Sequence, residues 1–522
     1  MLRRITLNQF KGGLRRLSTL TPVKNEPLTL PNGAQYEQPV GLFINGEFVK
    51  SKSGKRFETE NPTTETPIIS VYEAGEADAN LAVEAAKQAF KGWGFKTAPS
   101  ERGVLLNKLA DLIERDLNLI AAIETTDNGK VFAQAQGDVS LVVKVIRYYA
   151  GFADKIGGDV IQSNDGFFNY TRKEPLGVCG QIIPWNFPLL MWAWKIAPAL
   201  TTGNTVVLKT AESTPLSALY ACKLAQEAGF PKGVLNVISG FGPVGGVLSA
   251  HDDIKKIAFT GSTATGKLVA KTALTSNLKK TTMELGGKSP NIIFDDANLE
   301  DALSAAALGI FFNSGEVCCA GSRLFVQAGV YDKVVAAFKQ KAESVKVGDP
   351  FDPNSLQGPQ QNKNQFKKIL GYIEQGQKEG AHLLCGGSAQ AGPGKGYFIQ
   401  PTVFTDVNNN MSIVREEIFG PVLTITKFDT VDDVIAMAND SEYGLAAGIH
   451  TTDINKAHYV AENIASGTIW VNCYNAFHEA VPFGGYKQSG FGKEMGRDGL
   501  ENYLQTKAVR VKLDERKWAD KQ

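Results

Sequence analysis

The chain has 522 residues, 43% of them hydrophobic, which is enough to bury a large core and to form two or three domains. Its net charge is +1, and five positive charges lie within residues 1–20, so the rest is acidic on balance and a poor match for nucleic acid. No run approaches the ~18 consecutive apolar residues of a membrane span. Six cysteines without a CxxC pair and five unclustered histidines predict neither a disulfide framework nor a metal site.

The N-terminus has the composition of a targeting segment. Residues 1–25 carry six basic side chains and no acidic one, and their apolar residues roughly share one helical face. This pattern predicts a mitochondrial leader over residues 1–24, cleaved near 17–24, and hence a protein of the mitochondrial matrix. A disordered basic tail is the alternative.

The first elements after the leader are a hairpin and two helices. Asn45 and Gly46 interrupt alternating apolar residues in 42–49, which predicts a β-hairpin. Apolar residues at helical spacing predict helices over 77–90 and 100–123, the second with Ser100 as its N-cap.

Between residues 178 and 285, short buried strands alternate with helices, which predicts a parallel sheet in an α/β domain. A helix over 214–228 should end at Gly229. A second α/β series begins with a strand at 290–294 and a helix at 299–312 and runs to about residue 490, with a surface loop at 386–396. The strands of the first series are predicted at 178–184, 205–209, 235–239, 256–260 and 280–285.

Three strand ends are candidate nucleotide contacts. Residues 240–245 match GxGxxG, but the acid expected about 20 residues later is absent, so an ordinary turn is favoured. At 259–267 a strand ends where a helix begins, so free amides, the helix dipole and Ser262 would favour a pyrophosphate; a plain Ser cap fits this segment equally well. Lys209 and Glu212 follow another strand, where they contact a ribose or form a surface ion pair.

A thiol and a carboxylate are the candidate catalytic groups. Glu284 lies among apolar residues and glycines, and Cys318 and Cys319 end a long apolar run, with no histidine close in sequence to either. The pairing indicates covalent catalysis of an unusual kind. Taken singly, a free cysteine is more often a buried hydrophobe and a lone glutamate an ion-pair or helix-end carboxylate.

Asn186 is a candidate oxyanion donor. It lies between Pro184 and Pro188, which restrict the backbone and therefore the direction of its amide. The alternative is a turn asparagine bonded to its own backbone.

Six motifs together resemble the aldehyde dehydrogenase superfamily in order and spacing, over about residues 40–510. The stretch FPLLMWAWKIAPAL at 187–200, with the basic leader, is most similar to the fungal mitochondrial members that act on acetaldehyde. The six motifs are PWNFP at 184–188, FTGSTATG at 259–266, ELGGKS at 284–289, GEVCCAGSR at 315–323, EEIFGPV at 416–422 and PFGGYKQSG at 482–490.

The resemblance implies an α/β fold with three parts and a homotetramer built as a dimer of dimers. A parallel-sheet dinucleotide-binding domain would comprise 25–155 and 178–288, and an α/β catalytic domain 289–495. A small β oligomerisation extension would comprise 156–177 and 496–513, where alternating apolar residues at 503–513 suit a strand offered to a neighbouring subunit.

The resemblance also implies the catalytic roles. Cys318 matches the nucleophile and Cys319 its non-catalytic neighbour, while Glu284 matches the general base. The Asn186 amide and the Cys318 N–H match the oxyanion hole. The remaining catalytic matches are Lys195 and Glu494, a proton path behind Glu284.

The implied cofactor is NAD, with NADP as the alternative, and no metal. Lys209 and Glu212 match adenosine-ribose contacts, and Glu212 would repel a 2′-phosphate. Ser262 matches the pyrophosphate contact, Glu417 the nicotinamide-ribose ligand, and Phe419 packs near that ring. Further cofactor contacts are expected at Ile183, Pro184, Trp185, Gly242, Gly261, Gly266 and Leu285. The aldehyde tunnel is expected to be lined by Phe187, Met191, Trp194, Val317, Phe477 and Phe483.

The predicted activity is oxidation of small aliphatic aldehydes, acetaldehyde among them, to carboxylic acids through a cysteine thiohemiacetal and thioester. One alternative is an NAD(P)-dependent semialdehyde dehydrogenase, in which an arginine would hold the substrate carboxylate. The other is a non-redox cysteine acyl hydrolase, which would leave Lys209, Glu212, Ser262 and Glu417 unexplained.

Overall fold

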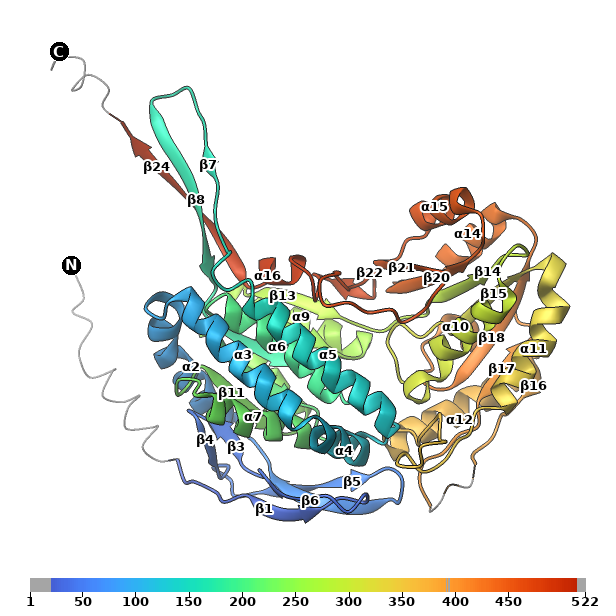
Figure 1. Ribbon diagram of the computed structural model, residues 1–522, viewed down its shortest axis with the longest axis horizontal. Helices are drawn as coiled ribbons and strands as arrows, with labels where there is room; N and C mark the ends of the chain where they lie inside the picture. Colours follow the sequence, from blue (N-terminus) through green and yellow to red (C-terminus); the bar gives the residue numbers. More distant parts are fainter. Residues whose placement is uncertain (1–19, 391, 393–394, 514–522) are drawn as a thin grey trace.

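The computed structural model describes residues 20–390, 392 and 395–513, and Figure 1 shows two lobes with a long β arm. Apart from residues 20–24, the predicted leader lies outside this description. Within the described ranges, no helix has both the length and the apolar character needed to cross a membrane.

The first lobe is built on an eight-stranded sheet with the order β23-β13-β12-β9-β10-β11-β3-β4. Its five central strands are parallel and largely buried, as the alternating pattern predicts, while β3 and β23 join its two sides antiparallel. β23 brings a C-terminal segment to the Glu284 end of β13. The strands are β3 Leu42–Ile44, β4 Glu47–Val49, β9 Val178–Ile182, β10 Thr205–Thr210, β11 Leu235–Ser239, β12 Ile254–Thr260, β13 Lys280–Glu284 and β23 Gly490–Phe491.

The strand predictions for this sheet are confirmed, with shifted ends. The predicted strand 178–184 ends at Ile182, since Pro184 has no N–H to continue the ladder. The predicted hairpin forms with positive φ at Asn45 and Gly46, as its two-residue turn requires.

Eight helices of the described chain belong to this lobe, some packed on the sheet and α3, α4 and α5 packed on other helices, and two predictions about them are wrong. The helix expected over 100–123 is two helices, broken at Asp116. Ser100 is not the N-cap, because Pro99, which suits the first helical position, starts the helix after Ala98. The helices are α2 Glu76–Phe95, α3 Pro99–Arg115, α4 Leu117–Asn128, α5 Phe132–Ala150, α6 Pro188–Thr201, α7 Leu216–Ala228, α8 Gly242–Ala250 and α9 Thr263–Asn277.

Two small hairpins at the start of the chain were not predicted, because their strands alternate only weakly. They pair β1 Glu26–Thr29 with β2 Gln35–Gln38, and β5 Arg56–Asn61 with β6 Thr66–Tyr72.

The second lobe holds a seven-stranded sheet, order β16-β17-β18-β15-β14-β20-β21, parallel except for β16. Its strands are β14 Pro290–Ile293, β15 Arg323–Gln327, β16 His382–Cys385, β17 Thr402–Thr405, β18 Val422–Phe428, β20 Ala446–His450 and β21 Thr468–Val471, with β19 Tyr443–Gly444 pairing β22 Tyr486–Lys487. Its helices are α10 Leu299–Phe311, η1 Phe312–Gly315, η2 Ala328–Val330, α11 Tyr331–Glu343, α12 Lys363–Lys378, α13 Ser412–Arg415, α14 Val431–Asn439 and α15 Ile454–Asn463.

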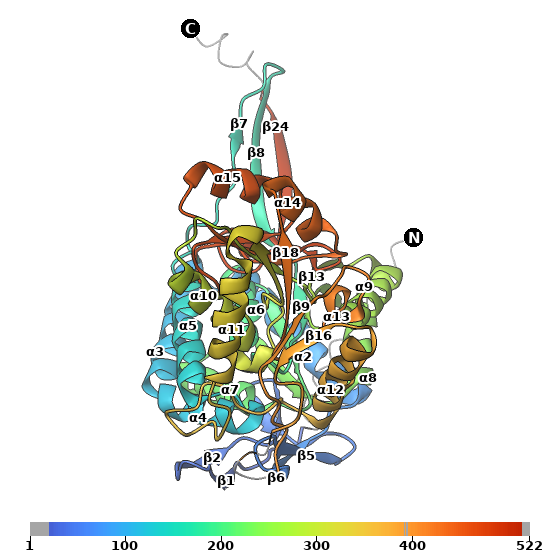
Figure 2. The ribbon, with the colours of Figure 1, turned by 90° about the vertical axis from the view of Figure 1, so that its right-hand side faces the viewer.

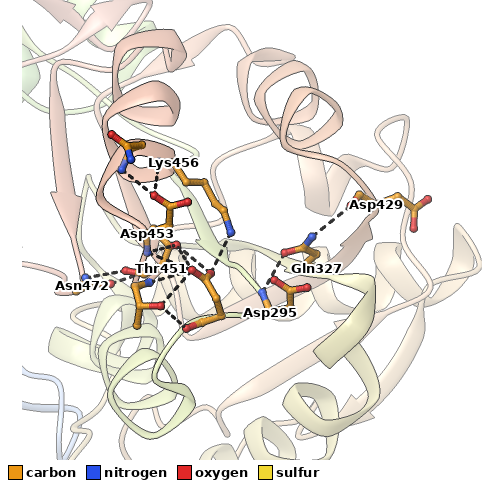
Figure 3. A network of polar contacts seen from close by, with 10 residues as sticks. Asp295, Gln327, Asp429, Thr451, Asp453, Lys456 and Asn472 are labelled. Atoms are coloured by element: carbon orange, nitrogen blue, oxygen red, sulfur yellow. Dashed lines mark hydrogen bonds and ion pairs between the residues drawn. The ribbon is translucent and has the colours of Figure 1, made fainter.

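Polar side chains tie the carboxyl ends of these strands together (Figure 3). The Thr451 N–H donates to the Asn472 side chain, whose amide donates back to the Thr451 carbonyl, both at 3.0 Å. The Asp295 N–H donates to the Gln327 side chain at 3.0 Å. Because every one of these groups is bonded, this edge is a structural network.

The arm consists of β7 Val160–Ile161, β8 Phe167–Pro175 and β24 Leu504–Lys512, which follows α16 Asp498–Glu501. β24 pairs antiparallel with β8 from Leu504 opposite Pro175 to Lys512 opposite Phe167. Both ribbon views show this sheet extending away from the two lobes (Figures 1 and 2). The strand predicted near the C-terminus is therefore confirmed.

Candidate active site

A cavity of about 820 Å³ brings most of the predicted site residues together. It is lined from both lobes: by α5, α6 and the β12–α9 turn on one side, and by the segments after η1, before β18 and after β21 on the other. Lys195, Lys209, Glu212, Ile183, Gly242 and Gly266 are not among the lining residues. The predicted residues that line it are Pro184, Trp185, Asn186, Phe187, Met191, Trp194, Gly261, Ser262, Glu284, Leu285, Val317, Cys318, Glu417, Phe419, Phe477, Phe483 and Glu494.

The cysteine pair follows a turn of unusual backbone. Asn313, Ser314 and Gly315 all have positive φ, at 47°, 56° and 75°, so the chain reverses sharply out of η1. Cys318 is partly exposed to the cavity, whereas Cys319 is fully buried and its thiol donates to Asn475 Oδ1 at 3.5 Å. A hydrogen bond with the Cys319 side chain and burial raise the pKa of the Cys318 thiol well above its usual range. Cys318 therefore needs a nearby base to react as a thiolate.

Asn186 is held against the nucleophile loop by two hydrogen bonds. Its Nδ2 donates to the Glu316 carbonyl at 2.8 Å, and Asn313 Nδ2 donates to the Asn186 carbonyl at 3.0 Å. The side chain is thus not bonded to its own backbone, which was the alternative reading. Since an amide nitrogen carries two hydrogens, one remains for a ligand in the cavity.

Glu284, at the end of β13, has the properties expected of a general base. It is 5% exposed, and neither carboxylate oxygen accepts a hydrogen bond from any described residue. Burial, then the charges of Glu494 and Cys318, raise its pKa well above the usual range. A carboxyl group of this kind can exchange protons near neutral pH.

Lys195 and Glu494 form a buried ion pair behind Glu284. Every residue of α6 is buried, and Lys195 Nζ pairs with Glu494 Oε1 and donates to Thr260 Oγ1 at 2.7 Å. Because Lys195 neutralises Glu494, the second carboxylate can lie beside Glu284 at a lower electrostatic cost. Thr260, absent from the predicted set, lines the cavity as well.

The glycines of the cofactor motifs sit where a side chain has no room. A Cβ on Gly266 would collide with Leu285, and one on Gly286 with the Glu417 carboxylate. Ser262 caps α9, accepting a hydrogen bond from the Thr265 N–H at 3.3 Å, and also lines the cavity. The start of a 15-residue helix therefore opens into the cavity, which suits a pyrophosphate.

Lys209 and Glu212 form an ion pair at the carboxyl edge of β10. Their Nζ and Oε2 atoms are 3.5 Å apart; the lysine side chain is 6% exposed and the glutamate side chain 45%. Burial lowers the pKa of Lys209. The arrangement leaves a half-exposed carboxylate free to accept ribose hydroxyls at the edge where nucleotides bind in such sheets.

Glu417 and Phe419 are presented by the segment before β18. Glu417 Oε1 accepts the Gly287 N–H at 3.0 Å, and burial raises the pKa of this carboxyl group. Phe419 has a positive φ of 62° and meets Trp185 edge to face, with ring centroids 5.4 Å apart. Two residues of α12 support this segment and were missed, because no motif surrounds them: Gln365 bonds the Phe419 carbonyl and Lys368 the Glu417 carbonyl.

The opposite part of the cavity is aromatic. Trp194, Phe477 and Phe483 pack together with ring centroids 5.3 to 6.0 Å apart. Phe187 stacks on Phe312, a lining residue that the sequence reasoning did not select. Among the described residues that line the cavity there is no arginine, so it lacks the carboxylate clamp expected of the semialdehyde alternative.

The comparisons with known proteins agree with this geometry. Residues 48–509 match the model of the aldehyde dehydrogenase family. The chain belongs to the aldehyde dehydrogenase family. It is 56% identical over 487 residues to an aldehyde dehydrogenase of Aspergillus niger, covering 93% of this chain and 98% of that protein. It is 51% identical over 518 residues to the mitochondrial aldehyde dehydrogenase of Rattus norvegicus, covering 98% and 99%.

A solved structure of a family member has the same fold. The NAD+ complex of the Bacillus cereus aldehyde dehydrogenase superposes with a TM-score of 0.90 at 50% identity, covering 91% of this chain and 97% of that one. The predicted fold class and the predicted enzyme class are both confirmed: this aldehyde dehydrogenase is an α/β enzyme with a small three-stranded extension.

Proposed function

We propose that this aldehyde dehydrogenase oxidises small unbranched aliphatic aldehydes, acetaldehyde first, using NAD. The observation that carries the proposal is the shared cavity, which is lined by Cys318, Asn186 and Glu284, by an aromatic cluster and by the start of α9. An aromatic pocket without an arginine clamp favours a small apolar substrate over a semialdehyde carboxylate. Within the family, the leader and the α6 sequence point to a fungal mitochondrial acetaldehyde-oxidising member.

The first step is addition of the Cys318 thiolate to the aldehyde carbonyl. The thiol proton goes to Glu284, which interacts electrostatically with Cys318. The oxygen that becomes negative accepts hydrogen bonds from the free Asn186 amide hydrogen and the Cys318 N–H. Each such donor lowers the barrier by about 3 kcal/mol in comparable sites. The product is a thiohemiacetal on Cys318.

The chain's own residues supply a fitting site for the cofactor. Lys209 and Glu212 would hold the adenosine ribose, the start of α9 with Ser262 the pyrophosphate, and Glu417 the second ribose. When bound there, NAD+ would supply the oxidant, accepting the hydride whose loss converts the thiohemiacetal into a thioester. The glycine contacts at 266 and 286 support this fit, since a side chain there would fill the cradle.

Glu284 completes the cycle by hydrolysis. Its carboxylate removes a proton from a water that attacks the thioester carbonyl, and the thiolate of Cys318 leaves with release of the carboxylic acid. Lys195 and Glu494 would pass the proton from Glu284 toward solvent. The acyl-hydrolase alternative would need this half of the site but not the nucleotide cradle.

NADH absorbance separates the three readings. Purified enzyme with NAD and acetaldehyde should produce NADH with a higher kcat/KM than with succinic semialdehyde. A preference for the semialdehyde would favour the second reading. Ester hydrolysis without any NADH formation from aldehydes would favour the hydrolase.

The Glu212 carboxylate should set the choice between NAD and NADP. Because its charge opposes a 2′-phosphate, Glu212→Gln should raise kcat/KM for NADP relative to NAD by about tenfold, the scale of a half-exposed charge interaction. Steady-state kinetics with both cofactors measure this ratio. A clear preference of the unaltered enzyme for NADP would contradict the assignment.

The role of Glu417 in cofactor binding can be tested by changing Gly286, which lies against its carboxylate. In Gly286→Ala the new methyl displaces the flexible Glu417 carboxylate, while the backbone fold has no reason to change. We expect KM for NAD to rise about tenfold, the value of one lost hydrogen bond to a charged group, with an unchanged melting temperature. If KM for NAD is unaffected, Glu417 is not a cofactor ligand.

The oligomeric state and the cellular location of the enzyme are further parts of the proposal. We keep the predicted domain boundaries, with the arm formed from 156–177 and 496–513. The arm exposes apolar side chains that suit contact with other subunits of a homotetramer: Val160, Phe168 and Val511. Relatives named mitochondrial in rat and human, and the basic leader, support import into the matrix. Light scattering of the enzyme tests the homotetramer, and a monomer would contradict it. Imaging of residues 1–24 fused to a fluorescent protein tests the matrix location, and a cytosolic reporter would contradict it.

A further inference from the structure

The loop that carries Asn186 is bonded on both sides by one helix end. Asn128 Nδ2 donates to the Trp185 carbonyl at 2.8 Å, one residue before Asn186. The Leu189 N–H, three residues after it, donates to Glu124 Oε1 at 3.0 Å. Both side chains come from the last five residues of α4 and are 1 to 2% exposed. A single rigid element therefore brackets the proposed oxyanion donor.

The Asn128 amide is fixed in one orientation. Its Oδ1 accepts the Lys130 N–H at 3.2 Å while its Nδ2 serves the Trp185 carbonyl, so exchanging the two atoms would break both bonds. Gly129 makes the intervening turn with a φ of 91°, and a side chain there would press on Pro62 and Pro359. The donor that reaches the Asn186 loop is thus set by the covalent geometry of the helix end.

Lys130 holds the next residue of the loop by a different force. Its ammonium lies 4.2 Å from the centre of the Phe187 ring and 2.6 Å from Asp138 Oδ2. The second oxygen of Glu124 is 3.9 Å away, and the lysine side chain has no exposed surface. A cation over a ring is attracted more strongly when both are buried, so Phe187 is held in place as well.

None of these three side chains is among the residues that line the cavity. We call Glu124, Asn128 and Lys130 the α4 clamp, and Asn128 bonds the Asn186 loop without touching a ligand in the cavity. One hydrogen of the Asn186 amide is committed to the Glu316 carbonyl, so the direction of the other depends on where the loop backbone lies. A displacement of 1 Å can cost about a hundredfold in rate.

We propose that the α4 clamp is a positioning unit that aims the free Asn186 N–H at the developing oxyanion. The inference rests on the oxyanion role proposed for Asn186. It assigns to Asn128 a function in the acylation step, in addition to the fold, and predicts that this function disappears when Asn186 has no amide to aim.

Asp127 provides a matched control on the same turn. It is 1% exposed, like its neighbours, but its Oδ2 accepts the Leu216 N–H at 2.9 Å at the start of α7. Asp127→Ala therefore removes a buried helix-capping bond without touching the Asn186 loop. It should lower the melting temperature as much as Asn128→Ala does and leave acylation within twofold of the unaltered enzyme.

The test is a double-mutant cycle on the full enzyme. The rate of the first turnover of NADH formation from acetaldehyde and NAD is measured for Asn128→Ala, Asn186→Ala and the pair. Alkylation of Cys318 by iodoacetamide is followed in parallel, since that displacement forms no oxyanion. We expect Asn128→Ala to slow the first turnover about tenfold alone and less than twofold on the Asn186→Ala background, with unchanged alkylation. Asn128→Ser is the milder replacement if the alanine variant does not fold.

The outcomes separate the inference from the proposed function. Equal slowing in both backgrounds, or slowed alkylation, means that Asn128 acts through general disorder of the site and overturns the inference. An equally large coupling between Asp127→Ala and Asn186→Ala would also overturn the inference. If Asn186→Ala leaves the first turnover unchanged, the oxyanion role itself fails and the inference falls with it.

Discussion

Cys318→Ala should abolish aldehyde oxidation, with a loss of at least about 10⁴-fold in kcat, because no other group can form the thiohemiacetal. Cys318 is the partly exposed member of the pair and borders the cavity beside Glu284. NAD binding should persist, since the thiol contributes nothing to the ribose or pyrophosphate contacts. NADH formation and cofactor titration measure the two quantities.

Cys319→Ala is the control for that loss. The Cys319 thiol is fully buried and bonded to Asn475, so its removal should cost stability and leave kcat within a few-fold. An inactive Cys319→Ala variant beside an active Cys318→Ala variant would reverse the assignment. The comparison is sharp because the two residues are adjacent and chemically identical.

Glu284→Gln should separate the two halves of the reaction. The amide keeps the size of the side chain but cannot take a proton from water, so hydrolysis of the thioester should slow by roughly 10³-fold, the scale of general-base catalysis. A first turnover of NADH would still form, although more slowly because the thiol has also lost its base. Intact-protein mass spectrometry should then show an acetyl adduct. Full steady-state turnover by this variant would exclude Glu284 as the base.

The pH dependence provides an independent check on Glu284. Burial and the neighbouring Glu494 and Cys318 raise its pKa well above that of an ordinary carboxyl group. The base works only when deprotonated, so turnover should fall as pH drops through this raised pKa and level off above it. The acid limb should disappear in Glu284→Gln. A limb at the pH of an ordinary exposed carboxylate would contradict the buried environment.

Much of the fold was accessible from local pattern. The parallel strands of both lobes appear as short apolar runs between helices, since strands covered on both faces must be apolar. The Asn45-Gly46 turn and the Gly229 helix end follow from positive φ that these residues tolerate best. The break at Asp116 did not show, because the apolar spacing continues through it and the contact of the Asp116 side chain with Tyr220 is tertiary.

The residues of the site likewise fall into those that local motifs predict and those that only tertiary contacts reveal. Sequence identified Cys318, Glu284, Asn186 and Glu417 because each lies in a motif with turn-forming glycines or prolines. It left Thr260, Gln365 and Lys368 unnoticed, since their contacts with the site are tertiary and no local motif surrounds Gln365 and Lys368. The partners of Asn186 lie at Glu316 and Asn313, more than a hundred residues away along the chain.

The amino-acid sequence by itself determined the α/β class and the family and predicted the catalytic residues, because these depend on local propensity and on motifs of a few residues. Only the tertiary structure decided which of the two thiols is partly exposed, what holds Asn186 and why the pKa of Glu284 is raised. Those properties come from burial and from hydrogen bonds between distant segments, such as β23 beside β13 and α4 beneath the Asn186 loop. Chain distance hides such contacts, and the desolvation they produce exists only in the packed protein.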